Sequence, residues 1–126
     1  MCDKRRRIAG RKRRNQIAEQ FVAYTRTMIA SPAYRVLSLQ GRKVLRRLEL
    51  EHMAHGGQDN GKLPCRYEDF IEYGCRKKSL SSALIEVGIL GFAKTVTLGT
   101  RAHGDIPGKA STFLLRVSWR VVQQRT

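Results

Sequence analysis

Apolar side chains recur every three or four positions through the first half of the chain, as they do in helices that bury one face. The earliest such stretch has apolar residues at Ile17, Phe21, Tyr24 and Met28. It predicts a helix over 15–30 with Asn15 as its cap, because an Asn side chain accepts a hydrogen bond from a free amide at a helix start. We expect this helix to break at Ser31-Pro32, since proline disfavours the helical conformation of the residue before it.

A second helix is predicted from Leu39 to His55, with Ser38 as its cap. Its buried face would consist of Val44, Leu45, Leu48 and Met53, and its exposed face of Arg42, Lys43, Arg46 and Arg47. The pair Gly56-Gly57 ends the helix, because glycine adopts the left-handed conformation at little cost. The next segment, 58–64, is rich in turn-forming residues and is predicted to be a loop.

Two further helices are predicted on either side of a tight turn. The first is short, covers 66–73 and closes at Gly74. Its apolar residues are Tyr67, Phe70 and Ile71. After the turn CRKK (75–78), Ser79 opens a helix that ends near Val87. The apolar stripe of that helix is Leu80, Ala83, Leu84 and Val87, and its outward face is Lys78, Ser81, Ser82 and Ile85, with Glu86 at the edge.

The last third of the chain changes to the alternating, β-branched pattern of strands. FAKTVTLG (92–99) and STFLLRVSW (111–119) predict two strands, and the polar segment 100–110 predicts the hairpin loop between them. The aromatic residues expected in the core are Tyr67, Phe70, Phe113 and Trp119. The predicted fold class is therefore α+β, mainly α-helical with one small β-hairpin.

The 126-residue chain is strongly basic, with 25 Lys and Arg, 10 Asp and Glu, and a net charge of +15. Eight of the basic residues lie within residues 1–14 beside one acid, Asp3, so this segment is predicted to be a flexible basic arm. Such a charge attracts polyanions, of which nucleic acid is the commonest. An anionic membrane surface is a weaker alternative, because Ile8 and Ala9 are the arm's main apolar residues and an anchor needs a full apolar face.

Composition narrows the class of protein further. Apolar residues make up 41% of the chain, close to an ordinary globular domain, so we expect one domain over 15–126. No apolar run approaches the ~18 residues of a membrane span, and the basic N-terminus lacks the apolar segment of a secretory signal. The cysteines, Cys2, Cys65 and Cys75, are odd in number and form no CxxC motif, which indicates a reduced, cytoplasmic location.

Neither a metal site nor a catalytic site is predicted. His52 and His55 stand three positions apart and Cys65 and Cys75 flank the next helix, but structural zinc needs thiols in closer pairs. We expect buried thiols and helix-end histidines instead. The chain has no Ser-His-Asp order, no glycine-rich phosphate loop and no cluster of aspartates, so we predict neither an enzyme nor a cofactor.

The predicted order of helix, helix, turn, helix, strand, basic loop and strand is the layout of a winged helix-turn-helix, here with an extra N-terminal helix. The helix-turn-helix would span about 66–88 and the wing about 92–119. RYEDFIEYGCRKKSLSSALIEVGILGFAKT (66–95), followed by TFLLRVSW (112–119), resembles the small winged-helix DNA-binding proteins of bacteria, plasmids and phages. These include MarR-like regulators and the winged-helix domains of plasmid replication initiators. The resemblance implies sequence-specific binding of double-stranded DNA, frequently as a dimer.

We therefore predict a transcriptional regulator associated with the nucleoid. Small side chains on helix 79–88 would let it approach the base edges of the major groove, while wing and arm contact the backbone or minor groove. The candidate residues on this helix and the turn before it are Arg76, Lys77, Lys78, Ser79, Ser81, Ser82 and Ile85. Those on the wing are Arg101, His103 and Lys109, and those on the arm are Arg5, Arg6, Arg7, Arg11, Lys12, Arg13 and Arg14.

Other functions fit the same pattern. The chain could be a plasmid or phage replication factor, an architectural DNA-binding factor, or an RNA- or ribosome-associated basic protein with exposed aromatic rings for base stacking. An adaptor for a polymerase or another regulator would carry an outward apolar patch near Ile85 and the 17–28 stripe. A homodimer would form through helix 15–30 or the C-terminal tail.

Overall fold

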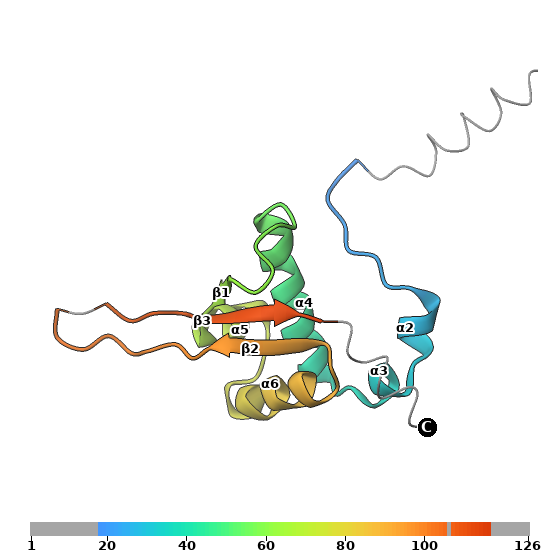
Figure 1. Cartoon of the computed structure of the whole chain (residues 1–126). Coiled ribbons are helices and arrows are strands. Elements are labelled where there is room, and N and C mark those ends of the chain that lie inside the picture. The colour runs from blue at the N-terminus through green and yellow to red at the C-terminus, as the bar shows by residue number, and fades with distance from the viewer. Residues whose placement is uncertain (1–17, 106, 117–126) are drawn as a thin grey trace, which may run out of the picture.

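The computed structural model describes residues 18–105 and 107–116. They form five α-helices, one short 3-10 turn and a three-stranded antiparallel sheet, which confirms the α+β class (Figure 1). In chain order the elements are α2 (Arg26–Ala30), α3 (Pro32–Val36), α4 (Leu39–Ala54), β1 (Leu63–Cys65), α5 (Tyr67–Tyr73), η1 (Lys77–Ser79), α6 (Leu80–Ile89), β2 (Ala93–Thr97) and β3 (Ser111–Leu115).

Helix α4 has the boundaries that the sequence predicts. Ser38 caps it, because its Oγ accepts a 3.0 Å hydrogen bond from the amide of Gly41. The helix ends at Ala54 with His55 as its C-terminal cap, immediately before the two glycines. The buried residues on α4 are Gly41, Val44, Leu45, Leu48 and Glu49. Met53 is half-buried rather than part of the closed core.

The prediction of a helix over 15–30 is wrong for residues 18–25, which are most of the segment that the structure describes. Residues 18–25 are not helical, and α2 contains only the final five residues, with Thr25 as its cap. Asn15, the predicted cap, lies outside the described residues. The break at Ser31 is confirmed, but the chain re-enters a helix at once, because Pro32 occupies the first turn of α3, where proline needs no amide hydrogen.

Contacts with α4 explain why residues 18–25 are extended. The hydroxyl of Tyr24 donates a 2.6 Å hydrogen bond to Glu49 Oε2, and the guanidinium of Arg46 lies 4.5 Å from the centre of the Tyr24 ring. Tyr24 also meets Tyr34 edge to face, and Tyr34 meets Phe92 in the same way. Burial raises the pKa of the Glu49 carboxyl and, together with the hydrogen bond to Glu49, the pKa of Tyr24. Tertiary contacts therefore override the helical spacing of this segment.

The sheet has one strand more than predicted. Its order is β1-β3-β2, and β1 pairs with β3 so that Leu63 lies opposite Phe113 and Cys65 opposite Ser111. The sequence predicts a loop at Leu63 and Pro64. A strand of three residues, Leu63–Cys65, is too short to produce an alternating pattern, so its pairing with β3 is what defines it.

Strands β2 and β3 form the predicted hairpin, although both are shorter than predicted. Ala93 lies opposite Leu115 and Thr95 opposite Phe113, and the register then shifts between Thr95 and Thr97. This irregularity is a β-bulge, which bends a strand and increases its twist. Trp119, predicted as core, lies outside the described residues.

The core lies between α4, α5, α6 and one face of the sheet. Its largest fully buried side chains include Phe70, Phe92, Leu48, Leu63 and Leu80. Phe70 and Phe113 meet edge to face at 5.8 Å between ring centres, and both are confirmed as core. Tyr67 was also predicted as core, and this is wrong, because its side chain is 46% exposed.

Leu48 and Leu50 provide a matched test of this core, because they are two residues apart on α4. Leu48 is fully buried, whereas Leu50 is 45% exposed. We expect Leu48→Ala to lower the free energy of unfolding by about 2–5 kcal/mol, since it removes buried area and leaves a cavity. Leu50→Ala should cost much less. Urea unfolding followed by circular dichroism measures both, and equal losses would contradict this description of the core.

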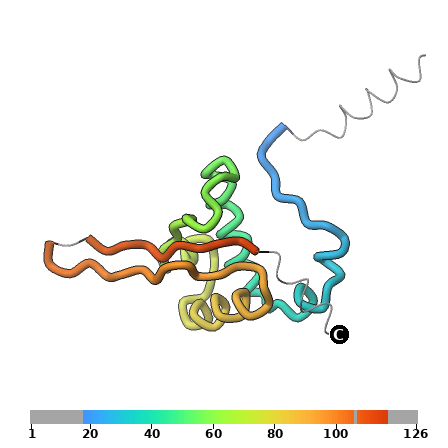
Figure 2. The backbone as a smooth tube through the Cα atoms, in the orientation of Figure 1, coloured from blue at the N-terminus to red at the C-terminus, as the bar shows by residue number. Residues whose placement is uncertain are grey.

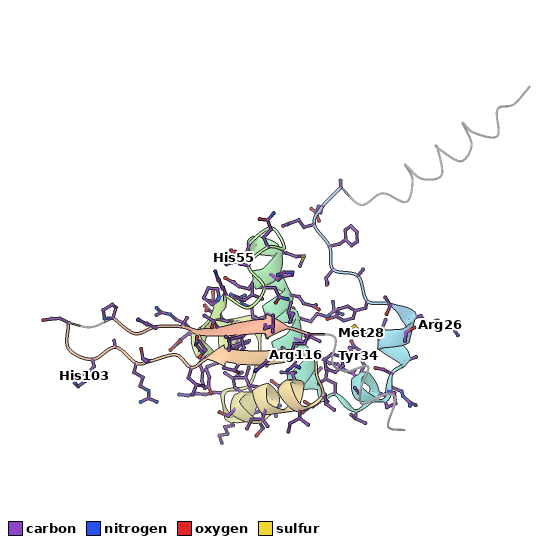
Figure 3. The ribbon with its side chains drawn as sticks, in the orientation of Figure 1. Arg26, Met28, Tyr34, His55, His103 and Arg116 are labelled. Atoms are coloured by element: carbon purple, nitrogen blue, oxygen red, sulfur yellow. The ribbon has the colours of Figure 1, made fainter. Side chains whose placement is uncertain are left out.

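His55 makes the stability of the α4 C-terminus depend on pH (Figure 3). Its Nδ1 lies 2.7 Å from Asp59 Oδ2 and its Nε2 lies 3.3 Å from Glu51 Oε1, and these hydrogen bonds raise the pKa of His55. A raised pKa means that the protonated form stabilises the fold. That contribution is present below the unfolded pKa of about 6.5 and is lost as the pH rises through the folded pKa.

We therefore expect the free energy of unfolding to decrease as the pH rises above about 6.5, and His55→Gln to flatten that dependence. Urea titrations at a series of pH values, with an NMR titration of the His55 ring, measure the effect. An NMR pKa for His55 at or below that of a free histidine would refute it.

Candidate nucleic-acid interface

Helix α6 presents the outward face that the sequence predicts. Leu80, Ala83 and Val87 are buried, and Leu84 is half-buried. The exposed residues on the other side are Lys78, Ser81, Ser82, Ile85 and Ile89. Ile85 and Ile89, one turn apart, are 62% and 74% exposed. The outward face thus begins basic, continues with two serines and ends apolar.

The turn between α5 and α6 fixes the direction of α6. Gly74 has a φ of 118°, a left-handed conformation that side-chain-bearing residues rarely adopt, so the chain can leave α5 sharply. Lys43 Nζ on α4 donates a hydrogen bond of 3.1 Å to the Gly74 carbonyl. The amide of Arg76 donates one of 2.7 Å to Gln40 Oε1, also on α4. The backbone of the turn is therefore bound to α4 at Gly74 and at Arg76.

The predicted basic residues of this turn are placed in solvent. Arg76, Lys77 and Lys78 are exposed, and Lys77 and Lys78 lie in the 3-10 turn η1. The prediction that Ser79 caps the start of the helix is wrong, because Ser79 is half-buried and makes no side-chain capping bond. Its backbone is already in the helical region, whereas a capping side chain needs an extended backbone.

Glu86, the single acidic residue of α6, lies at the edge of the outward face, and its carboxylate is bound at the start of α4. Its Oε1 accepts a 2.5 Å hydrogen bond from the amide of Ser38, at the start of α4. A carboxylate at this position offsets the positive end of the α4 dipole and leaves the outward face of α6 without a negative charge. A Cβ added at Gly41 would lie 3.0 Å from the same oxygen, so glycine leaves room for this contact.

The hairpin carries the second group of candidate residues, Arg101, His103 and Lys109, and all three are exposed. It extends well beyond the body of the molecule, from the end where α6 begins, and His103 lies near its tip (Figures 2 and 3). A bridge between Thr100 and Lys109 pairs its two arms outside the sheet. These residues therefore form a projection, separate from the α6 face.

Two features hold the hairpin in this form. Its arms come so close at Gly99 that an added Cβ would lie 2.6 Å from the carbonyl oxygen of Lys109, which excludes any side chain there. At Gly108, Arg66 Nη2 donates a 3.3 Å hydrogen bond to the carbonyl oxygen and so attaches the hairpin to the start of α5. These contacts join the two arms of the hairpin to each other and one arm to the start of α5.

Tyr67 is a member of the candidate interface that sequence reasoning missed. Its hydroxyl lies 3.2 Å from Ser81 Oγ, within hydrogen-bond distance, which places an aromatic ring beside the first turn of α6. Phe70 is the only buried residue of α5, and Tyr67, three positions earlier, is 46% exposed. The spacing carries no signal for this difference, because residues three apart lie on the same face of a helix.

Several predictions fall outside the described residues or find no counterpart in them. The seven candidate residues of the arm, between Arg5 and Arg14, lie in the segment that is not described. No three His, Cys, Asp or Glu side chains gather as a metal site within residues 18–105 and 107–116. Cys65 and Cys75 are buried, as expected. None of the described helices is long and apolar enough to cross a membrane.

Comparison with known proteins adds no assignment. No family model, curated protein or solved structure matches the chain.

Glu86 provides a test of how α6 is positioned. We expect Glu86→Ala to lower the free energy of unfolding by about 1.5–3 kcal/mol, because it removes a charge-assisted hydrogen bond to a helix start. Glu86→Gln keeps a neutral acceptor and should lose less. Urea unfolding measures both, with Glu19→Ala, at an exposed acid, as the control. If Glu86→Ala matched the Glu19→Ala control, the contact would have no structural importance.

Proposed function

We propose that this chain is a winged-helix protein that binds specific sequences of double-stranded DNA and regulates transcription. The observation that carries the proposal is the outward face of α6, with Lys78, Ser81, Ser82 and Ile85 all exposed beside a basic hairpin. A helix with its side chains is about 10–12 Å wide, and the major groove is about 12 Å wide. Small serines on that face allow a close approach to the base edges.

Each group on the two surfaces has a distinct role in this proposal. Lys77 and Lys78 neutralise phosphates at the entry of α6 into the groove, while Ser81 and Ser82 hydrogen-bond to base edges. Ile85 contacts a thymine methyl group. Arg101, His103 and Lys109 reach the adjacent backbone or minor groove from the hairpin, and the arm adds further phosphate contacts. The redirection of Glu86 toward α4 supports this assignment, because a carboxylate facing DNA would repel it.

Single-stranded RNA is a less favoured ligand. Readers of single strands stack bases on neighbouring exposed rings. The exposed rings among the described residues are Phe21, Tyr67 and Tyr73. Phe21 lies on the N-terminal segment, and the other two are six positions apart on α5, which places them on different sides of that helix. They offer no shared stacking surface.

The alternative function of a protein adaptor requires an apolar surface patch around Ile85. Ile85 and Ile89 form an exposed apolar pair, but the predicted companion stripe over 17–28 does not exist as a helix face. Of the helix 15–30 predicted as a dimer contact, only Arg26–Ala30 is helical among the described residues, and the alternative contact, the C-terminal tail, lies outside them. A small apolar contact at the end of a DNA-reading face fits thymine recognition without a protein partner.

The test is selection of the full chain on a pool of random double-stranded DNA at about 150 mM salt, a physiological ionic strength. We expect an enriched motif and a loss of affinity of tenfold or more for Lys78→Ala combined with Ser82→Ala, because base contacts are worth about 1–3 kcal/mol each. Lys62→Ala, at an exposed lysine away from both surfaces, is the control. If 6–10 phosphates are neutralised, affinity should fall about 10³–10⁵-fold between 50 and 200 mM salt.

Tight binding without a motif, unaffected by the double substitution, would overturn sequence-specific regulation and favour an architectural role. Preference for a single-stranded RNA competitor over the selected duplex would overturn DNA as the ligand.

A further inference from the structure

A groove separates α4 from α5 on the side of the molecule away from residues 18–22. Its volume is about 450 Å³. The residues that line it are Arg47, Leu50, Glu51, Ala54, Asp69, Glu72 and Tyr73. Leu50 and Tyr73 are 45% and 42% exposed, so apolar surface is open to solvent within it. No part of the described chain fills the groove.

The groove is negatively charged on a chain with a net charge of +15. Three carboxylates line it against one basic side chain, Arg47, which is held 3.0 Å from Glu51 Oε2. Asp69 accepts a hydrogen bond from the amide of Arg66, and Glu72 is exposed on the last turn of α5. A suitable occupant is therefore a cationic segment with some apolar content.

The arm has this composition. Residues 4–14 contain eight Lys and Arg with Ile8 and Ala9 between them, and no acid. We propose that this segment docks in the α4–α5 groove of its own chain, with its basic side chains against Glu51, Asp69 and Glu72 and its apolar pair against Leu50 and Tyr73. The docking describes the chain without DNA, because the same basic side chains cannot bind the groove and phosphates at once.

The path of the chain allows this contact within one molecule. Gln20 Nε2 donates a 2.9 Å hydrogen bond to the carbonyl oxygen of Met53, so the described chain begins beside the C-terminal end of α4. The groove is lined by Leu50 and Ala54, which lie near the same end of α4. Figure 1 shows that α5, the other wall of the groove, is on the opposite side of α4 from the segment that leads to α2. Arg11 precedes Ala18 by seven residues, which span up to about 25 Å when extended, more than the 10–12 Å diameter of a helix.

The full chain already carries a labelling site for the test. Cys2 lies next to the basic segment, whereas Cys65 and Cys75 are buried, and burial raises the pKa of the Cys65 thiol to about 12 and also raises the pKa of Cys75. Because the thiolate is the reactive form, a brief treatment with a methanethiosulfonate spin label should modify Cys2 selectively, with mass spectrometry to verify a single label. Loss of amide NMR signal in the ¹⁵N-labelled chain then reports proximity to the arm.

We expect the amide signals of Leu50, Ala54, Glu72 and Tyr73 to fall below half of their intensity in the reduced, diamagnetic chain. Signals of the hairpin residues 100–104 should persist. In about 1 M salt, where the screening length falls to about 3 Å, the groove signals should recover. Glu72→Lys should also restore them, whereas Asp105→Lys, an equal change of charge at the exposed hairpin loop, should not.

Two results would overturn the proposal. One is a loss of signal that is no greater at the groove than at the hairpin, or that is centred on residues 52–57 beside Gln20. The other is an equal loss at the groove when labelled ¹⁴N chain is mixed with unlabelled ¹⁵N chain, which would mean that the arm docks on a second copy.

Discussion

The direction of α6 depends on its attachment to α4. Leu80, Ala83 and Val87 bury one side of α6 in the core that Leu45 and Leu48 of α4 share. Burial of this kind has no directional preference, so polar contacts determine how the helix lies. Glu86 binds the start of α4, while Lys43 and Gln40 of α4 hold the turn before α6. The exposed serines of α6 acquire their orientation from these contacts.

Charge is distributed on this framework in a consistent way. Asp69 caps α5, Glu51 pairs with Arg47, Glu72 lines the groove, and Glu86 caps α4. Basic side chains on the α6 turn and the hairpin remain in solvent. The protein therefore presents a cationic face and a smaller anionic one. A polyanion would accordingly bind the cationic face, and in its absence the basic segment 4–14 would bind the anionic one.

Local signals predicted much of this architecture. The boundaries of α4 follow from Ser38 and the glycine pair, and the sharp exit from α5 follows from Gly74, because each depends on neighbouring residues in the sequence. The alternation of buried and exposed positions on α6 was predictable for the same reason. Of the candidate site, the sequence therefore placed the α6 face and the hairpin correctly in solvent.

The misses share a different cause, since each depends on a partner distant in sequence. Strand β1 exists because it pairs with β3, about fifty residues later. The segment before α2 is extended because Tyr24 bonds to Glu49. Tyr67 is 46% exposed and lies with its hydroxyl beside Ser81, fourteen residues later. None of these partners is indicated by the spacing of residues near the element concerned.

The placement of Glu86 allows the outward face of α6 to accept substitutions. Glu86, which anchors α6, borders the face formed by Lys78, Ser81, Ser82 and Ile85, but its carboxylate is bound to the Ser38 amide, and none of these four residues is buried. Substitutions at the four outward positions leave the anchor and the core intact. Selection, or a designer, can therefore vary the chemistry of that face while retaining the same scaffold, so new ligand preferences are accessible without loss of folding.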